Sequence, residues 1–244
     1  MIGAFIFRDY LLSYLDTPCP NFLDLIILKI MRNIDLVTGE YYHIFNHGID
    51  TRNITTDHYD SNRFVQCLKE FNTIQTTGGI YQNSFIKKSS NENTVDDIEP
   101  LVDILAYCFN PNHFHLLLRQ NIDDGIWKLM HRLTMGYSKY FNAKQKRKGS
   151  LFRGPFRAVH IVDDAQLLYT MAYVAYNDKI HKLGHGVSKL ARSNAEYLEK
   201  LPNDPHLRII FDQFKDEKDY KKYIEEVIEI SQRAKIEQSE LDDE

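Results

Sequence analysis

Residues 110–119 have the sequence Asn-Pro-Asn-His-Phe-His-Leu-Leu-Leu-Arg. The largely apolar segment 101–109 precedes them, and Asn-Pro-Asn is typical of a tight turn. We therefore expect a β-hairpin whose second strand begins at His113. Alternate side chains of a strand share a face, so His113 and His115 should point one way and Phe114 the other. Such a strand would offer two imidazoles to one metal ion, although paired histidines are also common on exposed strand faces.

The segments around this hairpin predict an α+β domain. Hydrophobic periodicity and turn signals predict a strand at 41–46, a helix at 59–71, a helix at 122–141, a strand at 158–162 and a helix at 165–179. Asp163-Asp164 is a favourable N-cap for the last of these helices. The resulting order is that of a ferredoxin-like antiparallel sheet backed by helices.

The two ends of the chain differ from this central part. We expect an N-terminal extension over residues 1–36, a catalytic domain over 37–184 and a helical, acidic C-terminal extension over 185–244. Charged and proline residues interrupt the apolar runs before Met31, so none is long enough to span a bilayer. Translation starting at Met31 would explain why residues 1–30 do not fit the pattern, and an additional helical arm is the alternative interpretation. The polar segment 73–98 is expected to be a loop.

Charge is distributed unevenly along the 244 residues, whose formal net charge is −4. Residues 122–160 contain nine Lys/Arg against two Asp, whereas residues 203–244 contain seven Lys/Arg against thirteen Asp/Glu. Screening limits electrostatic reach to about 8–10 Å, so the acidic end does not cancel a local basic surface. Three widely spaced cysteines form no metal-spaced pair or disulfide framework, which favours a reducing, cytoplasmic setting.

A row of polar aromatic residues lies on the helix expected at 165–179. Tyr169, Tyr173 and Tyr176 are followed by Asn177. Positions i and i+4 share a helical face, so Tyr173 and Asn177 should lie one above the other. An aromatic stripe packed on the sheet is the alternative interpretation.

Four blocks of the sequence together resemble the single-tyrosine HUH transposases, and specifically their REP-associated branch. The blocks are Tyr-His-Ile-Phe-Asn-His-Gly at 42–48, Asn-His-Phe-His-Leu-Leu-Leu at 112–118, Tyr-Ser-Lys-Tyr-Phe-Asn at 137–142 with Gly-Ser-Leu-Phe-Arg-Gly-Pro-Phe-Arg at 149–157, and Tyr-Val-Ala-Tyr-Asn-Asp at 173–178. The resemblance covers roughly residues 38–180. Four blocks in the family's order are far more specific than an isolated His-x-His.

The resemblance implies roles for four residues. His113, His115 and Asn177 would be metal ligands, and Tyr173 would be the nucleophile. It also implies a substrate of single-stranded or hairpin DNA, a homodimer, and a protein that acts at the nucleoid.

Three residues depart from the family pattern. Ala175 stands where the family has histidine, Asp178 where it has proline, and His47 where it has arginine. None of these positions is an implied ligand or nucleophile, so the departures bear on DNA preference and on whether activity is retained.

The implied chemistry is consistent with these residue types. Two imidazoles and an amide oxygen leave coordination positions open, and oxygen-rich surroundings favour Mg²⁺ or Mn²⁺. Such an ion can neutralise a phosphodiester while tyrosine attacks it, giving a covalent 5′-phosphotyrosine. The sequence contains no Walker-type phosphate loop, so no nucleotide cofactor is expected.

The basic segment that follows the helix at 122–141 is the candidate DNA-binding surface. Its cations could follow a phosphate backbone while its phenylalanines stack on bases, although a solvated charge run would look similar. The candidate residues are Lys144, Lys146, Arg147, Lys148, Phe152, Arg153, Phe156 and Arg157. We therefore expect a transposase that cleaves and rejoins single-stranded DNA. A domesticated DNA-binding module and a zinc hydrolase using His113 and His115 remain as alternatives.

Overall fold

The computed structural model of the protein describes residues 35–75, 99–183 and 214–242. Almost all of the predicted N-terminal extension and most of the predicted loop at 73–98 lie outside these residues. Within them the elements are β1 (Tyr41–His47), a 3-10 turn (Ile49–Thr51), α3 (His58–Glu70), β2 (Val102–Phe109), β3 (His113–Gln120), α5 (Gly125–Lys144), β4 (Arg157–Ile161), α6 (Asp164–Ala175), α7 (Asn177–Ile180) and α10 (Glu217–Asp242). The elements predicted between residues 41 and 162 are all present, with ends shifted by at most three residues.

The four strands form one antiparallel sheet in the order β2-β3-β1-β4. This order confirms the predicted ferredoxin-like arrangement, in which two strand–helix–strand units, β1-α3-β2 and β3-α5-β4, share one sheet. The predicted hairpin is also present, because β2 and β3 pair on either side of the turn at residues 110–112.

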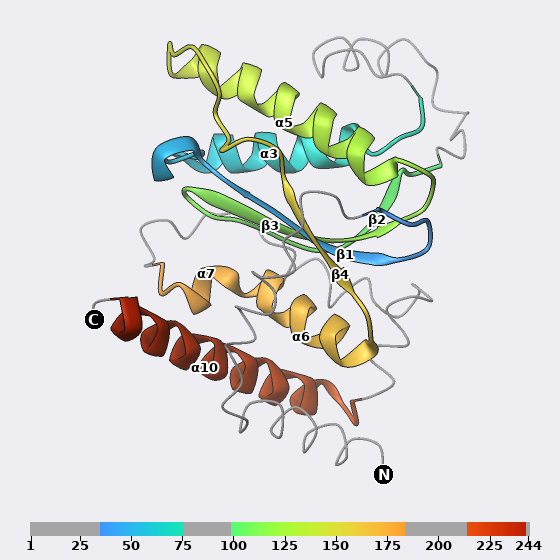
Figure 1. Cartoon of the computed structure of the whole chain (residues 1–244), viewed down its shortest axis with the longest axis vertical. Coiled ribbons are helices and arrows are strands. Elements are labelled where there is room, and N and C mark those ends of the chain that lie inside the picture. Colours follow the sequence, from blue (N-terminus) through green and yellow to red (C-terminus); the bar gives the residue numbers. More distant parts are fainter. Residues whose placement is uncertain (1–34, 76–98, 184–213, 243–244) are drawn as a thin grey trace.

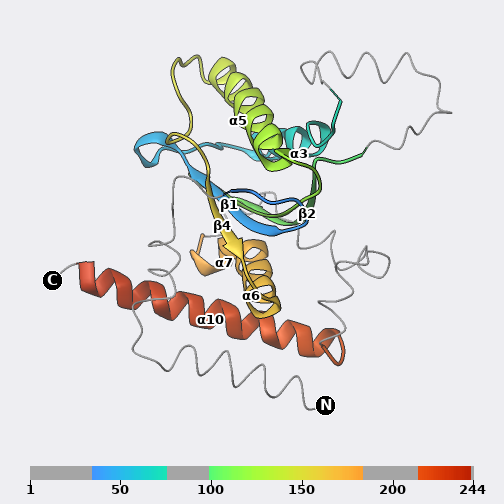
Figure 2. The same cartoon turned by 45° about the vertical axis from the view of Figure 1, so that its right-hand side comes forward.

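Helices cover both faces of the sheet (Figure 1). Helices α3 and α5 lie on one face, and α6 and α7 lie on the other, with α10 packed beneath them (Figures 1 and 2). The side-chain alternation of the strands explains the two layers, since Tyr42 and Ile44 of β1 join the α3–α5 core while Tyr41 packs on the α6 side.

Aromatic packing holds α3 and α5 against the sheet. Phe64 of α3 stacks on Phe109 of β2 with 4.0 Å between ring centroids, and Tyr137 of α5 meets both rings edge-on. A Cβ atom at Gly136 would lie 2.6 Å from the Phe71 ring, so any larger residue at this position of α5 would force that ring to move.

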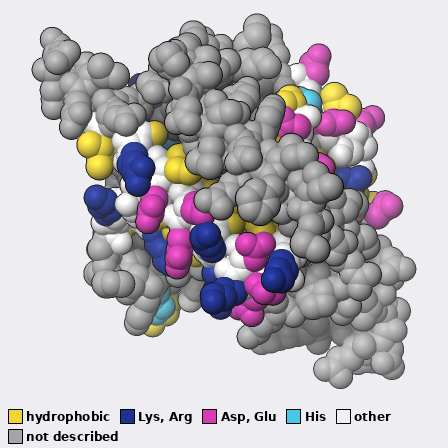
Figure 3. Space-filling model, turned by 90° about the horizontal axis from the view of Figure 1, so that it is seen from below, with side chains coloured by type: hydrophobic (Ala, Val, Ile, Leu, Met, Phe, Trp, Pro, Cys, Tyr) yellow, Lys and Arg dark blue, Asp and Glu magenta, His cyan; other side chains and the backbone are white. Residues whose placement is uncertain are grey.

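Helix α10 closes the second layer. Its Tyr220, Ile224 and Val227 are buried in one apolar cluster with residues of α6 and the sheet. Its outer side is charged, and Figure 3 shows Lys/Arg and Asp/Glu side chains interspersed over the described part of this face. No helix among the described residues is long and apolar enough to cross a membrane.

Candidate active site

Strand β3 presents its two histidines to the side of the sheet that α6 covers. Phe114, between them, joins the opposite core and packs 5.2 Å from Phe64. The His113 and His115 rings are buried, with centroids 5.1 Å apart and planes at 88°. The alternation of an extended strand thus places both imidazoles in one buried group.

Asn177 of α7 adds an amide oxygen to this group. Its Oδ1 lies 3.1 Å from His113 Nε2. His113 Nδ1 donates to Asn112 Oδ1 at 2.7 Å, which leaves a lone pair on Nε2. The Asn110 amide donates to both acceptors, at 2.8 Å to His113 and 2.6 Å to Asn177. Two lone pairs therefore converge at one buried point.

The helix expected at 165–179 is not continuous, and that prediction is wrong after Ala175. Helix α6 ends there because Tyr176 adopts φ −115° and ψ 20°, and α7 starts at Asn177. Tyr176 packs in the apolar cluster shared with α10, while Asn177 reaches the histidines of β3. Asn177 therefore joins the site from a separate turn of helix.

Tyr173 of α6 packs on the histidine group. Its ring lies edge-on to His115 at 5.7 Å and to His43 at 6.0 Å. Burial raises the pKa of the Tyr173 hydroxyl to about 12, and the neighbouring Asn177 side chain acts on this pKa in the opposite direction. The phenol is therefore protonated at neutral pH.

The other tyrosines considered as nucleophiles lie elsewhere. Tyr137 and Tyr140 belong to α5, on the far side of the sheet, where their hydroxyls donate to Ile54 O and Asp60 Oδ1. The Tyr169 hydroxyl is 2.9 Å from Ser231 Oγ of α10. The ammonium group of Lys179 lies over the Tyr176 ring.

Three further histidines surround the pair. His43 Nε2 is 2.8 Å from His115 Nδ1, His47 stacks on His113 at 5.2 Å, and the His181 ring is 4.9 Å from His113. Strand alternation could have identified His43 and His47 from the sequence, because residues 43, 45 and 47 of one strand share a face. His181 lies four residues after Asn177, which was a weaker signal.

Burial holds the histidine group neutral. It lowers the pKa of His43 and of His113 to about 4, and the pKa of His115 well below its usual value. Neutral imidazoles are the form that binds metal ions.

The residues present fit a divalent cation. Among the described residues no three His, Cys, Asp or Glu side chains form a metal-binding group. The expected set here contains an amide instead, and its converging acceptors suit a cation with oxygen and nitrogen ligands. The buried Asn177 Nδ2 also has no hydrogen-bond partner in the described part of the chain, which marks this amide as incompletely satisfied.

The basic loop, residues 145–157, runs past the edge of this group. The Arg153 backbone N–H donates to His47 O at 2.8 Å, and Arg157 pairs with Phe45, whose neighbour across the sheet is His115. The pKa of His47 is lowered by burial and then by the charges of Arg157 and Arg153. The exposed cations of the loop are Lys146, Lys148, Arg153 and Arg157.

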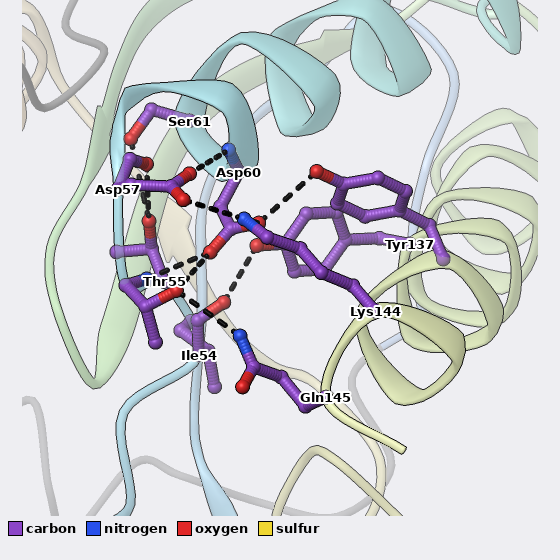
Figure 4. Close-up of polar contacts among 10 residues, drawn as sticks. Ile54, Thr55, Asp57, Asp60, Ser61, Tyr137, Lys144 and Gln145 are labelled. Atoms are coloured by element: carbon purple, nitrogen blue, oxygen red, sulfur yellow. Dashed lines mark hydrogen bonds and ion pairs between the residues drawn. The ribbon is translucent and has the colours of Figure 1, made fainter. Parts of the chain in front are cut away.

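Four other candidate DNA-binding residues have structural contacts. Lys144 forms ion pairs with Asp57 and Asp60 at 2.7 and 2.6 Å, as Figure 4 shows. Arg147 donates to the Asn142 side chain and to Ser150 O. Phe152 is buried in the α3–α5 core, and Phe156 is half-buried against Trp127 at 4.7 Å. Stacking of Phe152 on a base would require this ring to leave the core.

Residues 99–177 match a family model described as Transposase IS200 like. The predicted resemblance to these transposases is confirmed. The matched segment runs from β2 to Asn177 and includes both histidines of β3 and Tyr173. The match of this segment to the transposase model supports a DNA-binding function of the transposase type.

A solved structure of a REP-associated tyrosine transposase bound to a REP hairpin is also similar to this chain. It is 13% identical with a TM-score of 0.44, and the alignment covers 70% of this chain and 86% of that one. No curated protein matches the chain.

Proposed function

We propose that the protein is a metal-dependent transposase that cleaves and rejoins single-stranded, hairpin-forming DNA through Tyr173. The observation that supports this most directly is the meeting of Tyr173 with the polar group of β3. Its ring packs on His115, and Asn177, whose Oδ1 lies next to His113 Nε2, lowers the pKa of its hydroxyl. Nucleophile and candidate ligands thus converge within the segment that matches the transposase family.

In the proposed reaction the Tyr173 oxygen attacks the phosphorus of a phosphodiester. The bond from phosphorus to the tyrosine oxygen forms while the bond to the 3′ oxygen breaks, and the 3′ oxygen keeps the electron pair and takes up a proton. The phenol loses its proton in the same exchange. The products are a 5′-phosphotyrosine and a free 3′-OH, and attack by a 3′-OH on the phosphotyrosine rejoins the strand without ATP.

His113, His115 and Asn177 would hold the divalent ion, Mg²⁺ or Mn²⁺. When bound, the ion would supply positive charge to a non-bridging phosphate oxygen. The protein itself orients the ligands. His43 Nε2 meets His115 Nδ1 and Asn112 accepts from His113 Nδ1, so that each ring keeps its Nε2 for a ligand role.

The exposed cations of the basic loop would guide the DNA strand to the site. The charges of Arg153 and Arg157 already lower the pKa of His47, which stacks on the candidate ligand His113. A DNA backbone held by the loop would thereby reach the nucleophile Tyr173. A homodimer and action at the nucleoid follow from the family resemblance and belong to the same proposal.

The proposal is tested with Tyr173→Phe, because this change removes the hydroxyl and keeps the ring. Tyr169→Phe is the matched control, since its ring stacks on Tyr173 at 6.2 Å on the same helix. Each variant is incubated with hairpin oligonucleotides from the DNA flanking its gene and with Mg²⁺ or Mn²⁺. Covalent adducts are then separated on denaturing gels.

The wild type and Tyr169→Phe should form an adduct, and Tyr173→Phe should bind the hairpin without forming one. An adduct with Tyr173→Phe would assign the nucleophile to another tyrosine. Binding without any adduct in the wild type would favour a DNA-binding module of the same fold.

A further inference from the structure

Asn110 lies at the centre of the candidate metal site, although its position in the turn before β3 suggested only a structural role. Its side chain is fully buried. The amide nitrogen Nδ2 lies 2.8 Å from His113 Nε2 and 2.6 Å from Asn177 Oδ1, and these two acceptors are 3.1 Å apart. The three atoms therefore form a compact triangle.

The dimensions of this triangle match one face of a six-coordinate ion. Mg²⁺ requires nearly octahedral ligands at about 2.0–2.1 Å, so neighbouring ligand atoms lie about 3 Å apart. All three sides fall near this value. Hydrogen bonds also have this length, which means that one set of side-chain positions can serve both states.

We propose that Asn110 is a further ligand of the divalent ion, and this inference rests on the metal site of the proposed function. The carboxamide is nearly symmetric in shape, so half a turn about its Cβ–Cγ bond would exchange Oδ1 and Nδ2. Oδ1 then faces the ion together with His113 Nε2 and Asn177 Oδ1. Without the ion, the N–H₂ group donates to the same two atoms and holds them in place.

The surroundings of Asn110 accommodate both orientations. On its other side, Oδ1 now accepts from Cys108 Sγ at 3.3 Å. After the half-turn the N–H₂ group would face this sulfur, which is a weak acceptor. The half-turn exchanges these hydrogen bonds for an oxygen–metal contact.

The test measures metal binding without DNA, by the loss of the free Mn²⁺ signal in electron paramagnetic resonance. Asn110→Leu keeps the branching at Cγ and removes the oxygen, whereas Asn110→Asp keeps an oxygen and adds charge. Asn72→Leu is the matched control, because Asn72 clasps the backbone of Val102 at the opposite end of β2. Thermal unfolding in EDTA checks that each variant is folded.

We expect Asn110→Leu to weaken Mn²⁺ binding at least tenfold, since even outer partners of a ligand contribute about that much. Asn110→Asp should bind at least as tightly as the wild type, and Asn72→Leu should bind like it. Unchanged or tighter binding by a folded Asn110→Leu would overturn the inference, because Asn110 would then be a bystander or a competitor. Absence of Mn²⁺ binding in the wild type would instead refute the metal site as a whole. An unfolded Asn110→Leu leaves the decision to Asn110→Asp, whose weaker binding would contradict a ligand role.

Discussion

His43 is a buried base whose protonation opposes folding. Its pKa of about 4 in the folded protein compares with about 6.5 in an unfolded chain. The unfolded state therefore binds more protons between these values, so stability is complete above pH 6.5 and is lost progressively toward pH 4. The shift corresponds to roughly 3 kcal/mol at 1.36 kcal/mol per pKa unit.

Replacing His43 with Gln should therefore flatten the dependence of unfolding free energy on pH between 4 and 6.5. The measurement is urea unfolding at several pH values. His160→Gln is the control, because that ring is partly exposed at the sheet edge and pairs with Glu40. An unchanged slope in His43→Gln would show that other groups dominate acid unfolding.

At the residue scale, the sequence predicted what depends on local periodicity. The shared face of His113 and His115 follows from strand alternation alone. The central position of Asn110 does not, because a turn residue gives no direction for its side chain. Its contact with Asn177 joins positions 67 apart, and only the folded chain brings them together.

At the scale of elements, Lys144 connects α5 to the start of α3. Its ammonium group donates to Asp57, the N-cap of α3, and to the fully buried Asp60 (Figure 4). Asp60 also accepts hydrogen bonds from Thr56 and Tyr140. These partners lie more than 80 residues away, so the sequence placed Lys144 in the basic surface instead. Removing the cation would take away a positive charge that offsets the burial of the Asp60 carboxylate.

We expect Lys144→Met to lower the free energy of unfolding by about 1–3 kcal/mol, a value reduced for its partial exposure. The salt dependence of DNA binding should stay unchanged. Lys139→Met, on the exposed side of the same helix, should alter neither property. Normal stability with a flatter salt dependence would return Lys144 to the DNA-binding surface.

Replacing cations of the basic loop should have the opposite effects on stability and on DNA binding. Lys146 and Lys148 are exposed, so replacing both with Gln should leave stability intact and weaken oligonucleotide binding. Each lost phosphate contact reduces the slope of log K against log salt by about 0.7 for single strands. The control replaces Lys221 and Lys222 of α10, which pair with Glu217 and Glu226. Equal slopes for both double variants would mean that the loop faces away from DNA.

The break between α6 and α7 marks the limit of prediction for elements. No glycine or proline occurs near Tyr176, so residues 165–179 have the pattern of one helix. The chain instead turns where Tyr176 meets the apolar cluster and Asn177 meets β3. Tertiary contacts therefore override local propensity at the point where the candidate ligand joins the site.

At the scale of the whole molecule, the two ends of the chain lead to different expectations. The apolar runs before Met31 are interrupted by charges and prolines and do not continue the domain pattern. A chain that starts at Met31 should keep the stability and DNA affinity of the full chain. Thermal unfolding and oligonucleotide titration compare the two, and loss of solubility on truncation would contradict this.

The C-terminal helix should behave as part of the domain, although the sequence suggested an extension. Ile224 of α10 is buried in the cluster beneath α6, whereas Ile236 on the same helix is 48% exposed. Ile224→Ala should lower the free energy of unfolding by about 2–4 kcal/mol, because a buried cavity adds to the lost transfer free energy. Ile236→Ala should cost well under about 1 kcal/mol.

Urea unfolding of the two variants decides between an integral helix and an appendage. If α10 is integral, both variants unfold in one transition and only Ile224→Ala shifts its midpoint. Equal midpoints would mean that α10 packs too weakly to belong to the domain, and residues 185–244 would then be a separate extension. The distinction bears on the site, because α10 contacts residues that flank it in the sequence. Ser231 of α10 contacts Tyr169, which precedes the nucleophile Tyr173, and Lys235 contacts His181, which follows the candidate ligand Asn177. A firmly packed α10 would therefore hold both flanking residues in place.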